Sequence, residues 1–114
     1  MKINARKKGH AYELQIRDLF KKLGWERCVS SRSESKNKDD AGVDLCFTDP
    51  FSIQAKAVEK LGSIHDILDS MPKDSNFNLV FHKRNRKGTI VAMSVEDFTE
   101  ILQMLINNQI IKPK

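Results

Sequence analysis

Apolar and polar positions follow two different periods along this chain, and the periods predict a mixture of helices and strands. Apolar residues recur at helical spacing over residues 5–23, and Gly24 is suited to end a helix there. A short helix is expected over 61–70, before Pro72. Strands are predicted by shorter apolar runs at 27–31, 42–48, 51–58, 77–82 and 89–93.

The C-terminal part of the chain predicts a second amphipathic helix. Ser94 is a good N-cap residue, and Asp97 stands three positions later, in a near capping box. We expect the apolar face of this helix to pack mostly on the core; it comprises Val95, Phe98, Ile101, Leu102, Leu105 and Ile106. The polar segment 31–40 is expected to be an exposed loop. The resulting order, α-β-β-β-α-β-β-α, predicts an α/β or α+β sandwich.

Length and composition limit the class of protein. The 114 residues predict one domain, 1–114, with a basic N-terminal arm at 1–8 and a C-terminal tail at 110–114. No apolar run reaches the roughly 18 residues of a membrane span, and no apolar segment follows the basic N-terminus as in a signal peptide. Cys28 and Cys46 form no CxxC motif, which favours reduced, buried thiols in a cytoplasmic protein.

Positive charge is the feature of the composition that points to a partner. The net charge is +5, from 20 Lys and Arg against 15 Asp and Glu. Such charge attracts phosphate backbones, although many basic surfaces are merely solvated. Tyr12 and Trp25 are too few to build a base-stacking platform, so contacts with a nucleic-acid backbone are expected. The basic residues cluster at Lys2, Arg6, Lys7 and Lys8, at Arg32, Lys36 and Lys38, and at Lys83, Arg84, Arg86 and Lys87.

The spacing between Asp44 and the Gln54-Ala55-Lys56 triplet indicates a candidate catalytic site. Asp44 ends one apolar segment, and nine residues separate it from Gln54-Ala55-Lys56 in the next. Side chains on a strand repeat every second residue, so Gln54 and Lys56 share a face, and a tight connection would bring Asp44 beside them. A carboxylate, an amide oxygen and an ammonium at one point can hold a divalent metal and a water molecule. A strand-end acid and an exposed lysine are the simpler interpretation of the same residues.

Three further acidic residues bear on this site. Glu13 lies on the first predicted helix, four residues after Gly9, from where a helix beside the sheet can direct its carboxylate at Asp44. A lone helical glutamate is usually solvated, so Glu13 gains interest only from the other residues. Asp39 and Asp40 are interpreted as loop residues, because they lack the placement of Asp44 on a strand.

Together, these motifs resemble the PD-(D/E)XK nuclease superfamily. The resemblance covers roughly residues 6–93 and is closest to archaeal and phage-type Holliday-junction resolvases. No proline precedes Asp44, and Gln54 replaces the usual glutamate, a variant also found in enzymes of the Mrr restriction type. The motifs that carry it are Gly9-x-x-x-Glu13, Gly42-Val43-Asp44 and Ile53-Gln54-Ala55-Lys56.

The resemblance implies a restriction-endonuclease-like fold, with a central mixed sheet flanked by helices, and Mg²⁺-dependent hydrolysis of phosphodiesters, with Mn²⁺ as a substitute. Asp44, Gln54, the Ala55 carbonyl and Glu13 are then the metal ligands, and Lys56 acts on the attacking water. Glu13, Asp44, Gln54 and Lys56 are the catalytic candidates. The DNA-binding candidates are Arg6, Lys7, Lys8, Arg32, Ser33, Arg84 and Arg86.

Three functions remain open on this sequence. The first is a homodimeric resolvase acting near the branch point of a four-way DNA junction, since symmetric cleavage needs two sites related by a two-fold axis. The second is a Mrr-like restriction or repair nuclease acting on duplex DNA. The third is a catalytically silent DNA-binding module. We expect a phage- or prokaryote-type protein in the cytoplasm and no membrane partner.

Overall fold

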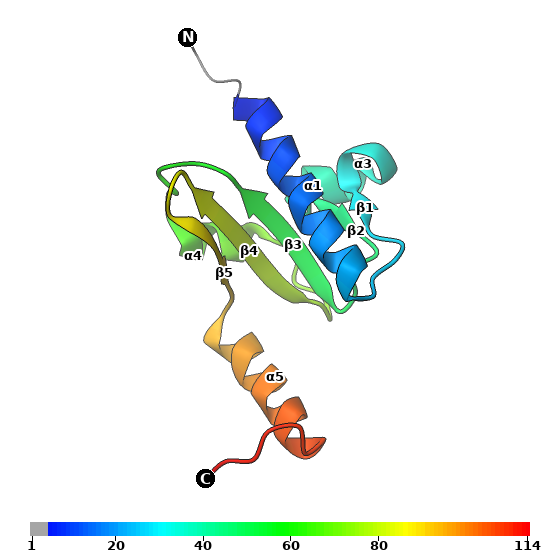
Figure 1. The fold of residues 1–114 in the computed structure, drawn as a ribbon, viewed down its shortest axis with the longest axis vertical. Coiled ribbons are helices and arrows are strands. Elements are labelled where there is room, and N and C mark those ends of the chain that lie inside the picture. The colour runs from blue at the N-terminus through cyan, green and yellow to red at the C-terminus, as the bar shows by residue number, and fades with distance from the viewer. Residues whose placement is uncertain (1–4) are drawn as a thin grey trace.

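A three-stranded mixed sheet flanked by helices forms the body of the molecule (Figure 1). The computed structural model describes residues 5–114, with side chains from Lys7 onward. In the sheet, β3 (Phe51–Lys56) runs parallel to β4 (Phe77–Arg84), and β5 (Gly88–Ala92) pairs with the other edge of β4 in the antiparallel sense. The structure is therefore of the α/β class, as the sequence predicted.

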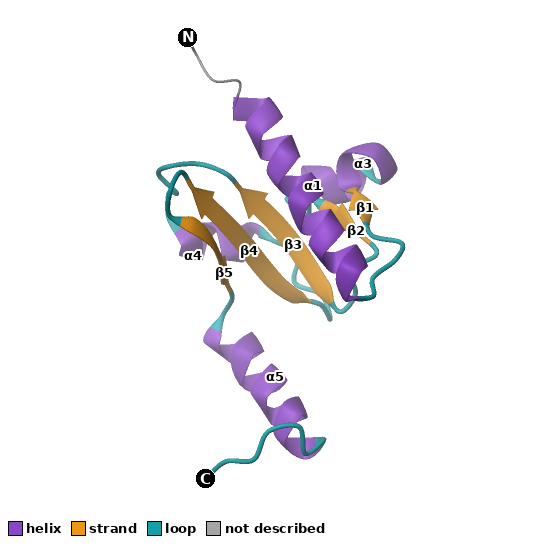
Figure 2. Ribbon diagram, in the orientation of Figure 1, coloured by secondary structure: helices purple, strands orange, loops and turns teal. Residues whose placement is uncertain are grey.

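Helices cover this sheet on both faces (Figures 1 and 2). The predicted first helix is confirmed as α1 (Ala5–Leu23), so residues 5–8 of the expected N-terminal arm are helical and residues 1–4 lie outside the described part. The connection from β3 to β4 contains α4 (Ile64–Ser70), on the opposite face from α1. None of the described helices is both long and apolar enough to cross a bilayer.

The hydrophobic core lies between α1 and the sheet. Tyr12, Ile16 and Phe20 are spaced four residues apart on α1, and all are buried against Ile53 and other strand residues. A cluster of ring contacts, in which Phe20 meets Trp25, Phe51 and Phe81, closes the end of this core. This packing fixes which side of α1 faces the sheet, and Glu13 lies on that side.

A second, two-stranded sheet lies beside the first, and its strands are shorter than predicted. It pairs β1 (Val29–Ser30) with β2 (Leu45–Cys46) in the antiparallel sense. Phe47 ends β2 because its φ of 62° is incompatible with an extended strand. Cys28 and Cys46 are buried free thiols, as expected.

The segment 31–40 is largely exposed, as its polarity predicted, but it is helical rather than a loop. It forms two one-turn helices, α2 (Ser31–Glu34) and α3 (Lys36–Asp40). The side chains of Ser30 and Ser35 accept hydrogen bonds from the backbone N–H groups of Arg32 and Lys38, so serines cap both turns. Ser31 is completely buried.

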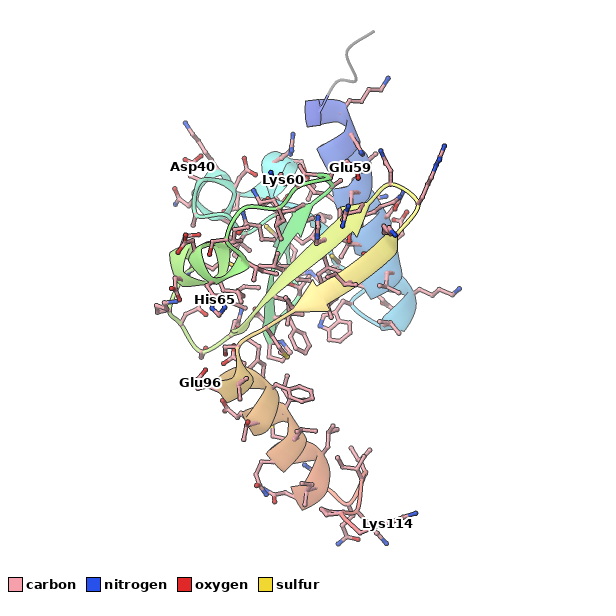
Figure 3. All side chains as sticks on the ribbon, turned by 90° about the vertical axis from the view of Figure 1, so that its left-hand side faces the viewer. Asp40, Glu59, Lys60, His65, Glu96 and Lys114 are labelled. Atoms are coloured by element: carbon pink, nitrogen blue, oxygen red, sulfur yellow. The ribbon has the colours of Figure 1, made fainter. Side chains whose placement is uncertain are left out.

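The last helix contradicts the expectation that it packs on the core. Ser94 caps α5 (Val95–Asn107) as predicted, but no residue of α5 is buried. The helix projects away from the sheet, with Glu96 at its near end and Lys114 beyond its far end (Figure 3). The molecule is consequently elongated, at 54 × 28 × 26 Å.

Candidate active site

Backbone hydrogen bonds place Asp44 at the junction of the two sheets. Its N–H donates to the Ile53 carbonyl at 2.7 Å, and its own carbonyl accepts from the Ser31 N–H at 2.8 Å. The side chain then reaches back to the sheet, where Oδ2 accepts a 2.7 Å hydrogen bond from the Ala55 N–H. These three bonds hold the carboxylate against the centre of β3.

Alternation along β3 determines which groups face Asp44. The Ile53 carbonyl and the Ala55 N–H point toward Asp44. The N–H and the carbonyl of one strand residue point to the same edge, so the Ala55 carbonyl also lies on this side of β3. Gln54 and Lys56 lie on one face and line a common cavity with Asp44. The predicted convergence of these three side chains is confirmed, although Asp44 precedes β2 rather than lying in it.

The cavity has a volume of about 200 Å³ and receives one further acid from α1. Glu13 is only 3% exposed, and it reaches the site because it lies on the helix face that packs against β3. Its expected convergence with Asp44 is therefore confirmed. The complete lining is Gly9, Glu13, Arg32, Asp44, Gln54, Ala55, Lys56, Ala57 and Val58.

Arg32 enters this cavity as the partner of Glu13, which the sequence did not predict. Its Nε lies 3.1 Å from Glu13 Oε2, and its Nη2 lies 3.0 Å from Oε1. His10 Nδ1 is 3.5 Å from Glu13 Oε2 on the other side. Nineteen residues separate Glu13 from Arg32, and nothing in the local pattern of either segment indicates the pair.

Gln54 is held close to the backbone of the preceding loop. Gly42 has a φ of 80°, and a Cβ at this position would lie 3.3 Å from Gln54 Oε1. Glycine therefore serves here both for its conformation and for the space it leaves. Gln54 Oε1 is buried and has no hydrogen-bond partner among the described residues. An orphaned carbonyl oxygen beside two carboxylates fits a site that binds a hard cation.

The protonation of Asp44 is shifted by its surroundings. Burial raises the pKa of its carboxyl to about 6, and the nearby charges of Glu13 and Asp39 act in the same direction. The hydrogen bond from Ala55 and the positive charge of Lys56 oppose this rise. A buried carboxyl whose pKa is raised in this way is stabilised as an anion by a cation placed beside it.

Metal ligation here would rest on a mixed set of donors. Within residues 5–114 as described, no three His, Cys, Asp or Glu side chains are grouped as ligands. The oxygen donors around the cavity are two carboxylates, the Gln54 amide and the Ala55 carbonyl. Such a set suits Mg²⁺, which keeps several of its own waters and needs few protein ligands.

Lys8 of α1 and Lys83 of β4 lie together next to this cavity. Lys8 Nζ donates to Asn85 Oδ1 at 3.1 Å, and Lys8 and Lys83 line a second hollow that shares Ala57 with the first. Arg86, in the turn, is exposed. Arg84 lies 3.8 Å from Glu59.

The remaining DNA-binding candidates are distributed less tightly. Lys7 is exposed on α1, whereas the side chain of Arg6 lies outside the described residues. Ser33 donates to the Ser30 carbonyl at 3.0 Å and is not part of the cavity lining. Asp39 and Asp40 end α3, so they are helical rather than loop residues, and neither lines the cavity.

Comparison with known proteins gives no relative for this chain. It matches no protein-family model, no curated protein and no solved structure. The resemblance to PD-(D/E)XK nucleases thus remains a prediction from its motifs.

Proposed function

We propose that this protein is a metal-dependent DNA endonuclease whose active site is the cavity around Asp44. The observation that carries the proposal is the convergence of four side chains on one cavity of about 200 Å³ beside basic residues: Glu13 from α1, Asp44 from the residue before β2, and Gln54 and Lys56 from β3. A purely structural role for the two carboxylates would not explain the half-buried Lys56 and the unpartnered Gln54 amide oxygen beside them. Phosphodiester hydrolysis uses all of these groups.

Each residue has a distinct part in this proposal. Asp44, Gln54, the Ala55 carbonyl and Glu13 hold Mg²⁺ or Mn²⁺, which when bound supplies positive charge to the phosphate and lowers the pKa of a water molecule. Lys56 positions that water and favours its hydroxide form by charge. The lysines and arginines of α1 and the β4–β5 turn hold the DNA backbone.

A four-way junction is the proposed substrate. The described residues offer basic groups but few exposed aromatic rings, so recognition rests on the geometry of phosphates. We expect the protein to bind and cleave a four-way junction in preference to a linear duplex at about 150 mM salt, where charges beyond about 8 Å are screened. Binding in Ca²⁺ and cleavage in Mg²⁺, each with labelled junction and duplex of equal length, measure this preference.

The outcomes separate the three functions. Equal affinity and equal cleavage of junction and duplex would favour the Mrr-like alternative, to which the amide of Gln54 also points. Binding without cleavage in either Mg²⁺ or Mn²⁺ would leave a silent DNA-binding module. Replacing Arg84 and Arg86 together should weaken both substrates without changing which is preferred.

A second copy of this chain is the proposed partner of α5. Seven of the eleven exposed large apolar side chains of the described residues lie between Ile90 and Ile111. An isolated helix of 13 residues is marginal in water, so the apolar face of α5 needs a protein surface to pack on. The helix contains three acids and no basic residue, which disfavours DNA or an anionic membrane as its partner.

Phe98→Asp is expected to convert a dimer into a monomer. Phe98 is half exposed in the first turn of α5, on its apolar face, and a charge there cannot be buried in a symmetric interface without a large cost. Light scattering after gel filtration should give twice the 13.1 kDa chain mass for the wild type and the single mass for the variant. Gln103→Glu adds the same charge on the polar face and should stay dimeric. A monomeric wild type at micromolar concentration would contradict the assignment.

A further inference from the structure

The ion pair between Glu13 and Arg32 occupies one of the carboxylates that the proposed metal would bind. Both oxygens of Glu13 are within hydrogen-bonding distance of the guanidinium, at 3.0 to 3.3 Å. The Glu13 side chain is 4% exposed, whereas that of Arg32 is 36% exposed. The two-point contact is the strong, directional form of an arginine–carboxylate pair. While it persists, both Glu13 oxygens are engaged by a positive guanidinium, which opposes the approach of another cation.

The two partners differ in how firmly the fold holds them. Glu13 lies on the 19-residue α1, between the buried Tyr12 and Ile16. Arg32 lies on α2, which is a single turn of four residues held by the Ser30 cap. Arg32 can therefore leave by rotating its own long side chain into solvent, whereas Glu13 cannot follow it without unpacking α1.

The charges of the cavity favour the departure of Arg32 from Glu13 when a divalent cation enters. With both carboxylates ionised, Glu13 and Asp44 balance Arg32 and Lys56. A divalent ion placed among these groups repels both cations at short range, in a partly buried site where the repulsion is weakly screened. The backbone of Lys56 is paired with His82 in the sheet, whereas Arg32 lies on a single helical turn, so we take Arg32 as the cation that moves.

We propose that Arg32 is a latch that exchanges its partner: it pairs with Glu13 in the metal-free protein, and a divalent cation at Glu13 and Asp44 releases it to bind a DNA phosphate. The proposal rests on the proposed function, because it takes the cation and the DNA from there. It adds a coupling that the site residues alone do not imply. Metal raises the affinity for DNA and DNA raises the affinity for metal, by the same factor.

Junction binding in EDTA tests the release of Arg32 without any metal. Glu13→Gln frees the guanidinium, so we expect it to bind a labelled four-way junction at least about fivefold more tightly than the wild type, the lower end of typical coupling between sites. Removing a negative charge also strengthens DNA binding in general. The control is therefore Glu13→Gln in an Arg32→Gln background, where the latch predicts that most of the gain disappears.

Asp18→Asn is a matched control on the same helix. Asp18 accepts from Arg17 Nε and Nη2, so this change also frees an arginine by turning a carboxylate into an amide, away from the cavity. It should change junction affinity by less than about twofold, as a screened surface charge does. An equal gain from Glu13→Gln with and without Arg32, or an equal gain from Asp18→Asn, would overturn the latch.

Titration of Mn²⁺ by calorimetry in the absence of DNA tests whether Arg32 competes with the metal for Glu13. Arg32→Gln should bind Mn²⁺ at least about fivefold more tightly than the wild type, and Arg32→Lys should lie between them because lysine cannot make the two-point contact. Equal or weaker binding by Arg32→Gln, with a melting curve that shows a folded protein, overturns the latch. Arg32→Lys provides the same comparison if the glutamine variant does not fold.

The failure of the latch and that of the proposed function give different results. Asp44→Asn should abolish Mn²⁺ binding in both the wild-type and the Arg32→Gln backgrounds. If it does, and Arg32→Gln does not gain affinity, the metal site stands and the latch is wrong. If Asp44→Asn leaves Mn²⁺ binding unchanged, the metal site itself is wrong, and the latch is wrong with it.

Discussion

Asp44→Asn is expected to abolish cleavage of a four-way junction and to leave junction binding in place. Asp44 is held between both sheets, and its carboxylate is hydrogen-bonded to Ala55 in β3, beside the other proposed ligands. Losing its charge should lower the cleavage rate at least about 10²- to 10³-fold, the usual loss when one electrostatic stabiliser of a transition state is removed. The basic residues of α1 and the β4–β5 turn are unaffected, so junction affinity measured in EDTA, where no metal contributes to DNA binding, should change little.

Asp39→Asn is the control for this variant. Asp39 is near enough to act on the pKa of Asp44, yet it does not line the cavity. The rate of the control should stay within a few-fold of the wild type in a gel assay with Mg²⁺. An Asp44→Asn protein that cuts as fast as the wild type would show that the site has been assigned to the wrong residues.

The same Asp44→Asn variant should be more stable than the wild type in EDTA at pH 7.5. The pKa of Asp44 is raised from 3.8 to about 6 because burial disfavours the anion. Its contribution to stability is complete below about pH 3.8 and is lost as the pH rises through 6. The asparagine is neutral at every pH and keeps an acceptor for the Ala55 N–H.

A shift of about two pH units corresponds to roughly 2–3 kcal/mol in the free energy of unfolding. Thermal melting at pH 7.5 and pH 4 should therefore show a higher midpoint for Asp44→Asn at the first pH and nearly equal midpoints at the second. A variant that melts below the wild type at pH 7.5 would show that the carboxylate, and not the neutral acid, suits the fold.

Lys56→Ala is expected to lose about 10²-fold or more in cleavage rate, with little change in metal affinity. Lys56 lines the cavity beside Asp44, and its positive charge lowers the pKa of that carboxyl, so the two groups interact in the folded protein. The ammonium is proposed to act on the water and the phosphate, which metal cannot replace. Single-turnover rates measured over a range of Mg²⁺ concentrations separate these effects.

Lys83→Ala is the matched control, because Lys83 lies on the adjacent strand and lines the neighbouring hollow. It should weaken junction binding and leave the rate at saturating protein unchanged. If excess Mg²⁺ fully restored the rate of Lys56→Ala, then Lys56 would serve to hold the metal ligands rather than to act on the water.

The sequence pattern was sufficient to predict secondary structure where a segment's own residues determine it. The helical period of 5–23 and the stop at Gly24 predicted α1, and the cap at Ser94 predicted the start of α5. The two-residue alternation of β3 predicted that Gln54 and Lys56 share a face. Periodicity follows from backbone geometry alone, so these features survive whatever packs around them.

Segments whose structure depends on distant partners were predicted poorly. Polarity indicated a loop at 31–40, but Ser30 and Ser35 cap two short helices there, and the second sheet buries Ser31. An apolar helix face indicates that the helix packs on another surface, but it does not identify that surface. No residue of α5 is buried: Val95, Phe98 and Met104 are exposed, and the other apolar residues of its face are only partly covered.

The sequence by itself determined the α/β class, the amphipathic helices and the residue types of the candidate site, because each is encoded in spacing along one segment. Only the tertiary structure decided that Arg32 binds Glu13, that burial raises the pKa of Asp44, and that α5 projects from the sheet. These features arise between segments far apart in the chain. Their energies depend on burial and distance, and neither quantity exists until the chain has folded.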